Sequence, residues 1–201
     1  MLLVLDNYDS FTYNLADALR AVNPDWRVVR NDDPTALACV LQARALVLSP
    51  GPGLPETSGV LLEAIRWADG RIPVLGICLG MQLLGVSSTE DGLTEGLGLV
   101  KNTVTKLIDS NEVSIKIPHV GFNRVQMPKE SKLFDQISID ASFYFVHSYA
   151  MQILDDSSKY ATTTYGHKFV AAIESGQIFG TQFHPEKSQK SGLKVLEGFL
   201  R

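Results

Sequence analysis

Two short segments of the chain carry side chains suited to nucleophilic catalysis. Cys78 lies between glycines in Gly76-Ile77-Cys78-Leu79-Gly80, at the end of an apolar run, and His184-Pro185-Glu186 follows much later. A cysteine nucleophile needs a general base that later acts as an acid, usually a histidine held by a carboxylate. In an extended backbone, residues two apart share one side, so the side chains of His184 and Glu186 can meet. This pattern predicts a Cys78 nucleophile, with His184 as its acid/base and Glu186 as the orienting carboxylate.

The segment around Cys78 is the cysteine counterpart of the Gly-x-Ser-x-Gly turn, which exposes a nucleophile between a strand and a helix. The glycines permit a strained turn and keep other side chains away from the sulfur. A helix that begins at Leu79 would favour the thiolate. The alternative interpretation is a buried cysteine flanked by packing glycines. Cys39, in Ala38-Cys39-Val40, has no such context and is predicted to lie in the core.

The other three histidines are weaker candidates for the base. His119 and His147 have no carboxylate nearby in the sequence, and His167 follows Gly166 in a predicted turn. We therefore expect these three to be structural and His184 to be the base.

Amide hydrolysis also needs donors for a tetrahedral oxyanion, which fixed backbone N–H groups stabilise best. The N–H of Leu79, directly after the nucleophile, is one predicted donor, and the Gly51-Pro52-Gly53 loop is a candidate for the other. The alternative for this loop is a simple turn. It is not a phosphate loop, because no Gly-Lys-Ser/Thr follows it.

Strand and helix signals that alternate along the chain predict the elements that position these residues. Continuous apolar runs between helices are typical of a parallel sheet covered on both faces. The predicted strands are 2–5, 26–29, 45–48 and 73–77, and the predicted helices are 10–22, 34–41, one carrying Leu61, Ile65 and Ala68, and a last one from about 188. Residues 97–183 are rich in β-branched and aromatic segments, with a hairpin over 171–180. We expect one three-layer α/β domain over residues 1–201, with a mostly parallel central sheet flanked by helices and a flavodoxin-like core.

The composition excludes several classes of protein. With 45% hydrophobic residues, 20% charged residues and a net charge of −4, the 201 residues suit one globular domain without a nucleic-acid surface. No apolar stretch approaches the roughly 20 residues that span a bilayer, and the N-terminal segment lacks the features of a signal peptide. Two cysteines fit a reducing, cytoplasmic location. We expect no metal and no organic cofactor.

Taken together, the motifs resemble those of the class I (triad) glutamine amidotransferases. The resemblance rests on Gly-Ile-Cys78-Leu-Gly-Met-Gln82 and Gln-Phe-His184-Pro-Glu186 and covers essentially the whole chain. It implies that the cysteine attacks the carboxamide of L-glutamine, that the histidine protonates the departing ammonia, and that a glutamyl thioester is hydrolysed to glutamate. It also implies a set of glutamine-holding positions, several of which act through backbone groups: Gly51, Gly53, Leu79, Gln82, Ser148 and Tyr149.

The two halves of the chain resemble different relatives. Segments 6–15, 30–32 and 48–55 resemble the glutaminase subunits of anthranilate and aminodeoxychorismate synthases. Segments 80–84, 96–99, 118–123 and 144–149 resemble the glutaminase subunit of imidazole glycerol phosphate synthase, from histidine biosynthesis. The sequence therefore predicts a hybrid chain, natural or engineered, with a junction between about Pro73 and Leu84.

The resemblance also implies a partner. Ammonia must reach its acceptor unprotonated, and nothing in the chain resembles a domain that binds an acceptor. We expect a heterodimer with a synthase, with the barrel-shaped cyclase of imidazole glycerol phosphate synthase as first choice, docked near residues 118–123. The alternatives are an anthranilate or aminodeoxychorismate synthase as partner, a non-catalytic scaffold that binds a synthase, and a flavodoxin-like module that binds flavin.

Overall fold

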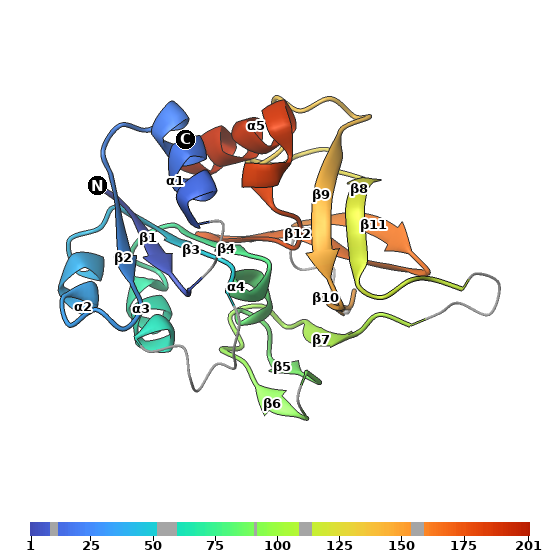
Figure 1. Cartoon of the computed structure of the whole chain (residues 1–201), viewed down its shortest axis with the longest axis horizontal. Coiled ribbons are helices and arrows are strands. Elements are labelled where there is room, and N and C mark those ends of the chain that lie inside the picture. The colour runs from blue at the N-terminus through green and yellow to red at the C-terminus, as the bar shows by residue number, and fades with distance from the viewer. Residues whose placement is uncertain (9–11, 52–59, 91, 109–113, 154–158) are drawn as a thin grey trace.

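A seven-stranded sheet forms the centre of the molecule (Figure 1). The computed structural model describes residues 1–8, 12–51, 60–90, 92–108, 114–153 and 159–201. The strands of this sheet lie in the order β11-β12-β13-β4-β3-β1-β2. The five strands β13, β4, β3, β1 and β2 run parallel to one another, whereas β12 runs antiparallel to both β11 and β13. The prediction of a mostly parallel central sheet is confirmed.

The bounds of the elements are as follows. The central sheet contains β1 Leu2–Asp6, β2 Trp26–Arg30, β3 Ala45–Leu48, β4 Val74–Ile77, β11 Lys159–Tyr165, β12 His167–Ser175 and β13 Ile178–Thr181. The helices are α1 Thr12–Val22, α2 Ala36–Val40, α3 Leu61–Ala68, α4 Leu79–Gln82 and α5 Gln189–Leu200, with the 3-10 helix η2 over Pro185–Lys187. A four-stranded sheet contains β5 Ser87–Ser88, β6 Thr94–Glu95, β7 Thr103–Lys106 and β10 Tyr149–Met151, and a two-stranded ribbon contains β8 His119–Arg124 and β9 Ser142–His147.

Helices cover both faces of the sheet and make three layers. α1 and α5 lie on one face, and α2 and α3 lie on the other (Figure 1). Because side chains alternate along a strand, each strand contributes to two cores. Val4 of β1 belongs to one core with Leu15 of α1 and Phe199 of α5, and its neighbour Leu5 belongs to the other with Ile65 of α3. The three-layer prediction is confirmed.

Most of the predicted elements occur, with small shifts at their ends. β1 and β2 extend one residue further than predicted, to Asp6 and Arg30, and the predicted helix 34–41 is shortened to α2. The hairpin of β12 and β13 turns at Gly176, where φ is +60°. Cys39 is buried, as predicted. Residues 10 and 11 of the predicted first helix lie outside the described residues.

The strand order places the segment around Cys78, which follows β4, beside the segment around His184, which follows β13. β4 and β13 are parallel neighbours with Ile77 opposite Thr181, and the N–H of Cys78 donates to the carbonyl of Thr181 at 2.7 Å. Sites in open α/β sheets gather where parallel strands end. Cys78 and Gln182 therefore meet at this edge although 104 positions separate them in the chain.

Candidate active site

The backbone at Cys78 makes a sharp turn from β4 into α4. Cys78 has φ +53° and ψ −107°, a strained combination for a residue with a side chain. A Cβ atom on Gly76 would lie 2.4 Å from the carbonyl oxygen of Gly80, and one on Gly80 would lie 3.0 Å from that of Leu48. The glycines let the turn fold tightly against β3 and β4, and the turn holds the sulfur of Cys78 at the edge of the sheet, half-buried.

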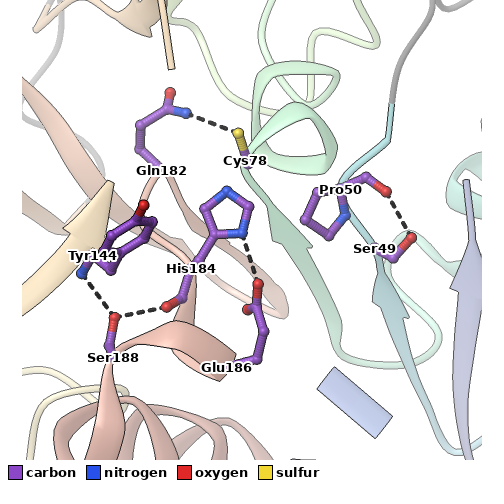
Figure 2. A network of polar contacts seen from close by, with 8 residues as sticks. All are labelled: Ser49, Pro50, Cys78, Tyr144, Gln182, His184, Glu186 and Ser188. Carbon is purple, nitrogen blue, oxygen red and sulfur yellow. Dashed lines mark hydrogen bonds and ion pairs between the residues drawn. The ribbon is translucent and has the colours of Figure 1, made fainter. Parts of the chain in front are cut away.

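His184 and Glu186 form a buried pair next to Cys78 (Figure 2). Nδ1 of His184 lies 2.7 Å from Oε1 of Glu186, and the two side chains are 3% and 0% exposed. The backbone of His184 is held on both sides, since its N–H donates to the carbonyl of Tyr144 at 2.9 Å and its carbonyl accepts from Ser188 Oγ at 2.6 Å. The imidazole is therefore fixed in position and orientation before any substrate binds.

The surroundings of His184 favour its charged form. Burial lowers its pKa, but the interactions of the ring with the neighbouring Cys78 sulfur and the Glu186 carboxylate outweigh burial and raise the pKa to about 9. At neutral pH the ring is an imidazolium, and a cation beside a sulfur favours the thiolate. Nε2 of His184 is buried without a hydrogen-bond partner among the described residues. With Nδ1 held by Glu186, Nε2 is the atom that can exchange a proton with sulfur or substrate.

A cavity of about 200 Å³ opens beside Cys78. It is smaller than the roughly 300–1,000 Å³ of sites for drug-sized ligands, and so suits a molecule of amino-acid size. Its lining residues are Gly51, Cys78, Leu79, Gln82, Glu90, Val146, His147, Ser148 and Tyr149. The structure thus brings together all the predicted glutamine-holding residues except Gly53, which lies outside the described residues. Gly51 packs so closely on Asn7 that a Cβ atom would lie 1.8 Å from its carbonyl oxygen.

Four residues at the site were given no functional role by the sequence: Gln182 beside the sulfur, and Glu90, Val146 and His147 in the cavity lining. Gln182 is fully buried and donates from Nε2 to Cys78 Sγ at 3.5 Å. Its position two residues before His184, directly after β13 ends at Thr181, was an available signal, because alternate residues of a strand share one side. Glu90 lines the cavity, but a carboxylate in a polar turn gives no comparable signal in the sequence.

His119 and His147, which have no carboxylate nearby in the sequence, pair with each other. Nδ1 of His119 lies 3.1 Å from Nε2 of His147, and the His119 ring stacks on Tyr165 with centroids 4.0 Å apart. Burial lowers the pKa of His119 to about 4 and that of His147 to about 3, so both rings are neutral at pH 7. His167 follows Gly166, whose φ is +73°, at the turn between β11 and β12, as predicted.

The neutral histidine pair predicts acid sensitivity. Below about pH 6.5 these two rings bind protons in the unfolded chain, whereas in the folded chain they stay neutral down to about pH 4. The free energy of unfolding therefore decreases as the pH is lowered from about 6.5 to about 4. His119→Asn removes one of the two titrating rings. The slope of the unfolding free energy against pH should then decrease by up to about 1.4 kcal/mol per pH unit, although the variant is less stable at pH 7. Urea unfolding at pH 7, 6 and 5 measures this slope, and an identical slope in both proteins would contradict the assignment.

Comparison with known proteins defines the class first. The class I glutamine amidotransferase family model matches residues 3–201, so the chain belongs to this family and is a glutamine amidotransferase. The fold agrees: a Thermoplasma acidophilum protein provisionally assigned to GMP synthase superposes with a TM-score of 0.74 at 22% identity, over 99% of this chain and 91% of that one.

More similar relatives belong to one group, imidazole glycerol phosphate synthase subunit HisH. Subunit HisH 1 of Campylobacter jejuni strain 81-176 is 46% identical over 80% of this chain and 83% of its own length. HisH of Methanocaldococcus jannaschii is 39% identical over 93% of each chain. Subunit HisH 2 of Vibrio vulnificus is 37% identical over 100% of this chain and 94% of its own.

These relatives give no support to a hybrid chain with a junction between Pro73 and Leu84. The M. jannaschii and V. vulnificus proteins align across 93% and 100% of the chain, so relatives of one kind extend over both predicted halves. The hybrid interpretation depended on motifs of a few residues each, and an alignment over the full length outweighs them.

Two further observations concern the described part of the chain. None of its helices has the length and apolar character needed to cross a bilayer. Within the same residues, no group of three or more histidine, cysteine or acidic side chains is arranged to hold a metal ion.

Proposed function

We propose that this chain is the glutaminase subunit of an imidazole glycerol phosphate synthase, which hydrolyses L-glutamine and delivers the ammonia to a cyclase subunit in histidine biosynthesis. The observation that carries the chemistry is the buried His184–Glu186 pair beside the strained turn at Cys78. The choice of synthase is supported by the HisH relatives, which cover most or all of the chain.

In the proposed reaction, Cys78 attacks as the thiolate while His184 is an imidazolium. The C–S bond forms, and the carbonyl oxygen becomes an oxyanion that the N–H of Leu79 is placed to stabilise, because the first N–H groups of a helix have no intrahelical acceptor. Nε2–H of His184 then protonates the departing amide nitrogen, ammonia leaves, and a glutamyl thioester remains. His184, now neutral, takes a proton from water, which attacks the thioester and releases glutamate and the thiolate. Glu186 keeps Nδ1–H oriented throughout.

The cavity provides the groups that hold glutamine in this proposal. Gly51, Leu79, Gln82, Ser148 and Tyr149 surround the sulfur, and the Glu90 carboxylate at the same cavity can accept from the substrate's ammonium group. Gly53 stays a predicted member of this set. No metal or organic cofactor takes part in these steps.

The ribbon β8–β9 supports a partner at the predicted place. Val120 and Phe122 of β8 are 56% and 52% exposed, and the Phe122 ring packs edge-on against Tyr144 of β9, with centroids 5.5 Å apart. Exposed apolar side chains that lie together mark interaction surfaces. We propose that the cyclase docks on this ribbon to form a heterodimer, and that residues 1–201 act as one domain. A cytoplasmic location, which the two cysteines predicted, stays a prediction.

Glutamine hydrolysis with candidate partners tests the proposal. Glutamate release by the purified chain should rise at least about tenfold with the cyclase, and not with an anthranilate or aminodeoxychorismate synthase. Phe122→Asp should remove the rise, whereas Leu41→Asp, at a side chain of matched exposure (51%) after α2, should keep it. If glutamate release rises only with a chorismate-using synthase, that synthase replaces the cyclase as the partner. If glutamate release in every mixture is no higher than that of a Cys78→Ser variant, the chain is a non-catalytic scaffold.

A further inference from the structure

A buried glutamine outside the proposed triad touches both the nucleophile and a substrate-holding side chain. Gln182 is 0% exposed. Its Nε2 donates to Cys78 Sγ at 3.5 Å, and its Oε1 accepts from Gln82 Nε2 at 3.0 Å (Figure 2 shows the contact with Cys78). Burying a carboxamide is unfavourable unless both of its ends find partners. Here the two partners are the proposed nucleophile and a proposed glutamine-holding residue.

The backbone carbonyl of Tyr149 fixes the orientation of this carboxamide. That oxygen can only accept, and Gln82 Nε2 donates to it at 3.0 Å. The NH₂ group of Gln82 therefore also faces Gln182, so the Gln182 side chain must accept this hydrogen bond through its oxygen. The Gln182 NH₂ group is then turned toward Cys78 Sγ, where it acts as a donor and not as an acceptor.

The same carbonyl also orders the histidine pair behind it. His147 Nδ1 lies 2.8 Å from the Tyr149 oxygen and must carry the hydrogen. Because His147 is neutral at pH 7, its Nε2 accepts from His119 Nδ1. The carbonyl thus receives one hydrogen bond from the β9 side and one from Gln82. The hydrogen bonds therefore run from Cys78 through Gln182 and Gln82 to the Tyr149 carbonyl, which the histidine pair also holds in place.

We infer that Gln182 is a positioning residue for the amidotransferase reaction: its N–H stabilises and aims the Cys78 thiolate, and its oxygen holds Gln82 against the cavity. This inference rests on the proposed function. A carboxamide does not titrate, so its hydrogen bond to sulfur persists while His184 changes charge during the reaction. In this inference the Cys78 sulfur has one permanent hydrogen-bond donor, Gln182, and one acid/base, His184. A purely structural Gln182 would support the fold and leave the reactivity of the sulfur unchanged.

Alkylation of Cys78 by iodoacetamide tests the inference without glutamine. Gln182→Leu removes the donor at similar size, and Gln182→Glu keeps the shape but places a carboxylate at the sulfur. The matched control is Gln152→Leu, because Gln152 donates to Thr105 Oγ1 at 2.7 Å and not to the site. The rate at Cys78, read by mass spectrometry of its peptide from pH 5 to 10, should fall about tenfold at pH 7 in Gln182→Leu and further in Gln182→Glu. Such a loss is typical of removing a hydrogen bond to a charged group.

The pH–rate profile should move to higher pH in both Gln182 variants and stay unchanged in Gln152→Leu. For glutamine hydrolysis, kcat should fall about tenfold or more in both Gln182 variants. Profiles of the folded variants that match the wild type would overturn the inference, and if Gln182→Leu fails to fold, the Glu variant decides alone.

The two proposals fail separately. If the wild-type chain hydrolyses glutamine but the Gln182 variants show an unshifted pH–rate profile, only the inference about Gln182 is overturned. A shifted profile in a wild-type chain that releases no glutamate with any partner supports the contact with sulfur and overturns the proposed function.

Discussion

Cys78→Ala is expected to abolish glutamine-dependent synthesis by the assembled synthase while leaving synthesis from added ammonium salts largely intact. Without the sulfur no thioester forms, and loss of a nucleophile typically costs at least about 10⁴-fold in kcat. In the proposed synthase the acceptor chemistry belongs to the partner, which can take its nitrogen from added ammonia. Glutamate release and product formation, measured with glutamine and then with ammonium chloride, separate the two functions.

Cys39→Ala is the matched control for this prediction. Cys39 is the other cysteine, buried against α3 and the sheet and free of the strained backbone found at Cys78. Its replacement should lower stability slightly and keep glutamine hydrolysis. Loss of both the glutamine-dependent and the ammonia-dependent activity in Cys78→Ala would instead indicate a defect in folding or docking.

Glu186→Gln is expected to lower kcat for glutamine hydrolysis by about 10³- to 10⁴-fold, the cost typical of removing the carboxylate that orients a catalytic histidine. The carboxamide has nearly the same shape, so KM should change little. Glu197→Gln, at an exposed carboxylate on α5, is the control and should leave both constants unchanged. A loss below about tenfold would contradict the proposed role of Glu186.

The same variant should change how stability depends on pH. The pKa of His184 in the folded chain is about 9, above its unfolded value near 6.5, so protonated His184 stabilises the fold fully below pH 6.5. That contribution is lost as pH rises through about 9. Glu186 is one source of the raised pKa, so Glu186→Gln should show a smaller loss of unfolding free energy between pH 6.5 and 9.5. Urea unfolding at the two pH values measures it, and equal losses would contradict this origin.

The sequence predicted those parts of the site that depend on neighbouring residues. The apolar runs of β1, β3 and β4, the glycines around Cys78 and the spacing of His184 and Glu186 are all local patterns. The pairing of His184 with Glu186 occurs as expected, but the extended backbone assumed for it is wrong, because Glu186 lies in the 3-10 helix η2. The structure brings these residues together because β4 and β13 are parallel neighbours.

The parts that could not be predicted depend on contacts between distant residues. Gln82 and Gln182 are 100 positions apart, and His119 and His147 are 28 apart. Neither pair carries a local pattern, because an amide or a neutral ring has no fixed partner until the strands have paired. The ribbon β8–β9 and the four-stranded sheet were missed for the same reason: the composition of residues 97–183 indicated strands but not their pairing.

The order of strands in the central sheet has a consequence for synthesis of the chain on the ribosome. β4 emerges early, yet one of its two neighbours is β13, which is made about a hundred residues later. Until then the fully buried run Val74–Ile77 is an open sheet edge, the kind that invites pairing with other chains. The proposed nucleophile Cys78 is also synthesised before its proposed base His184, so a nascent chain contains the cysteine before the histidine. If these roles hold as proposed, ammonia release begins only after β13 has paired with β4.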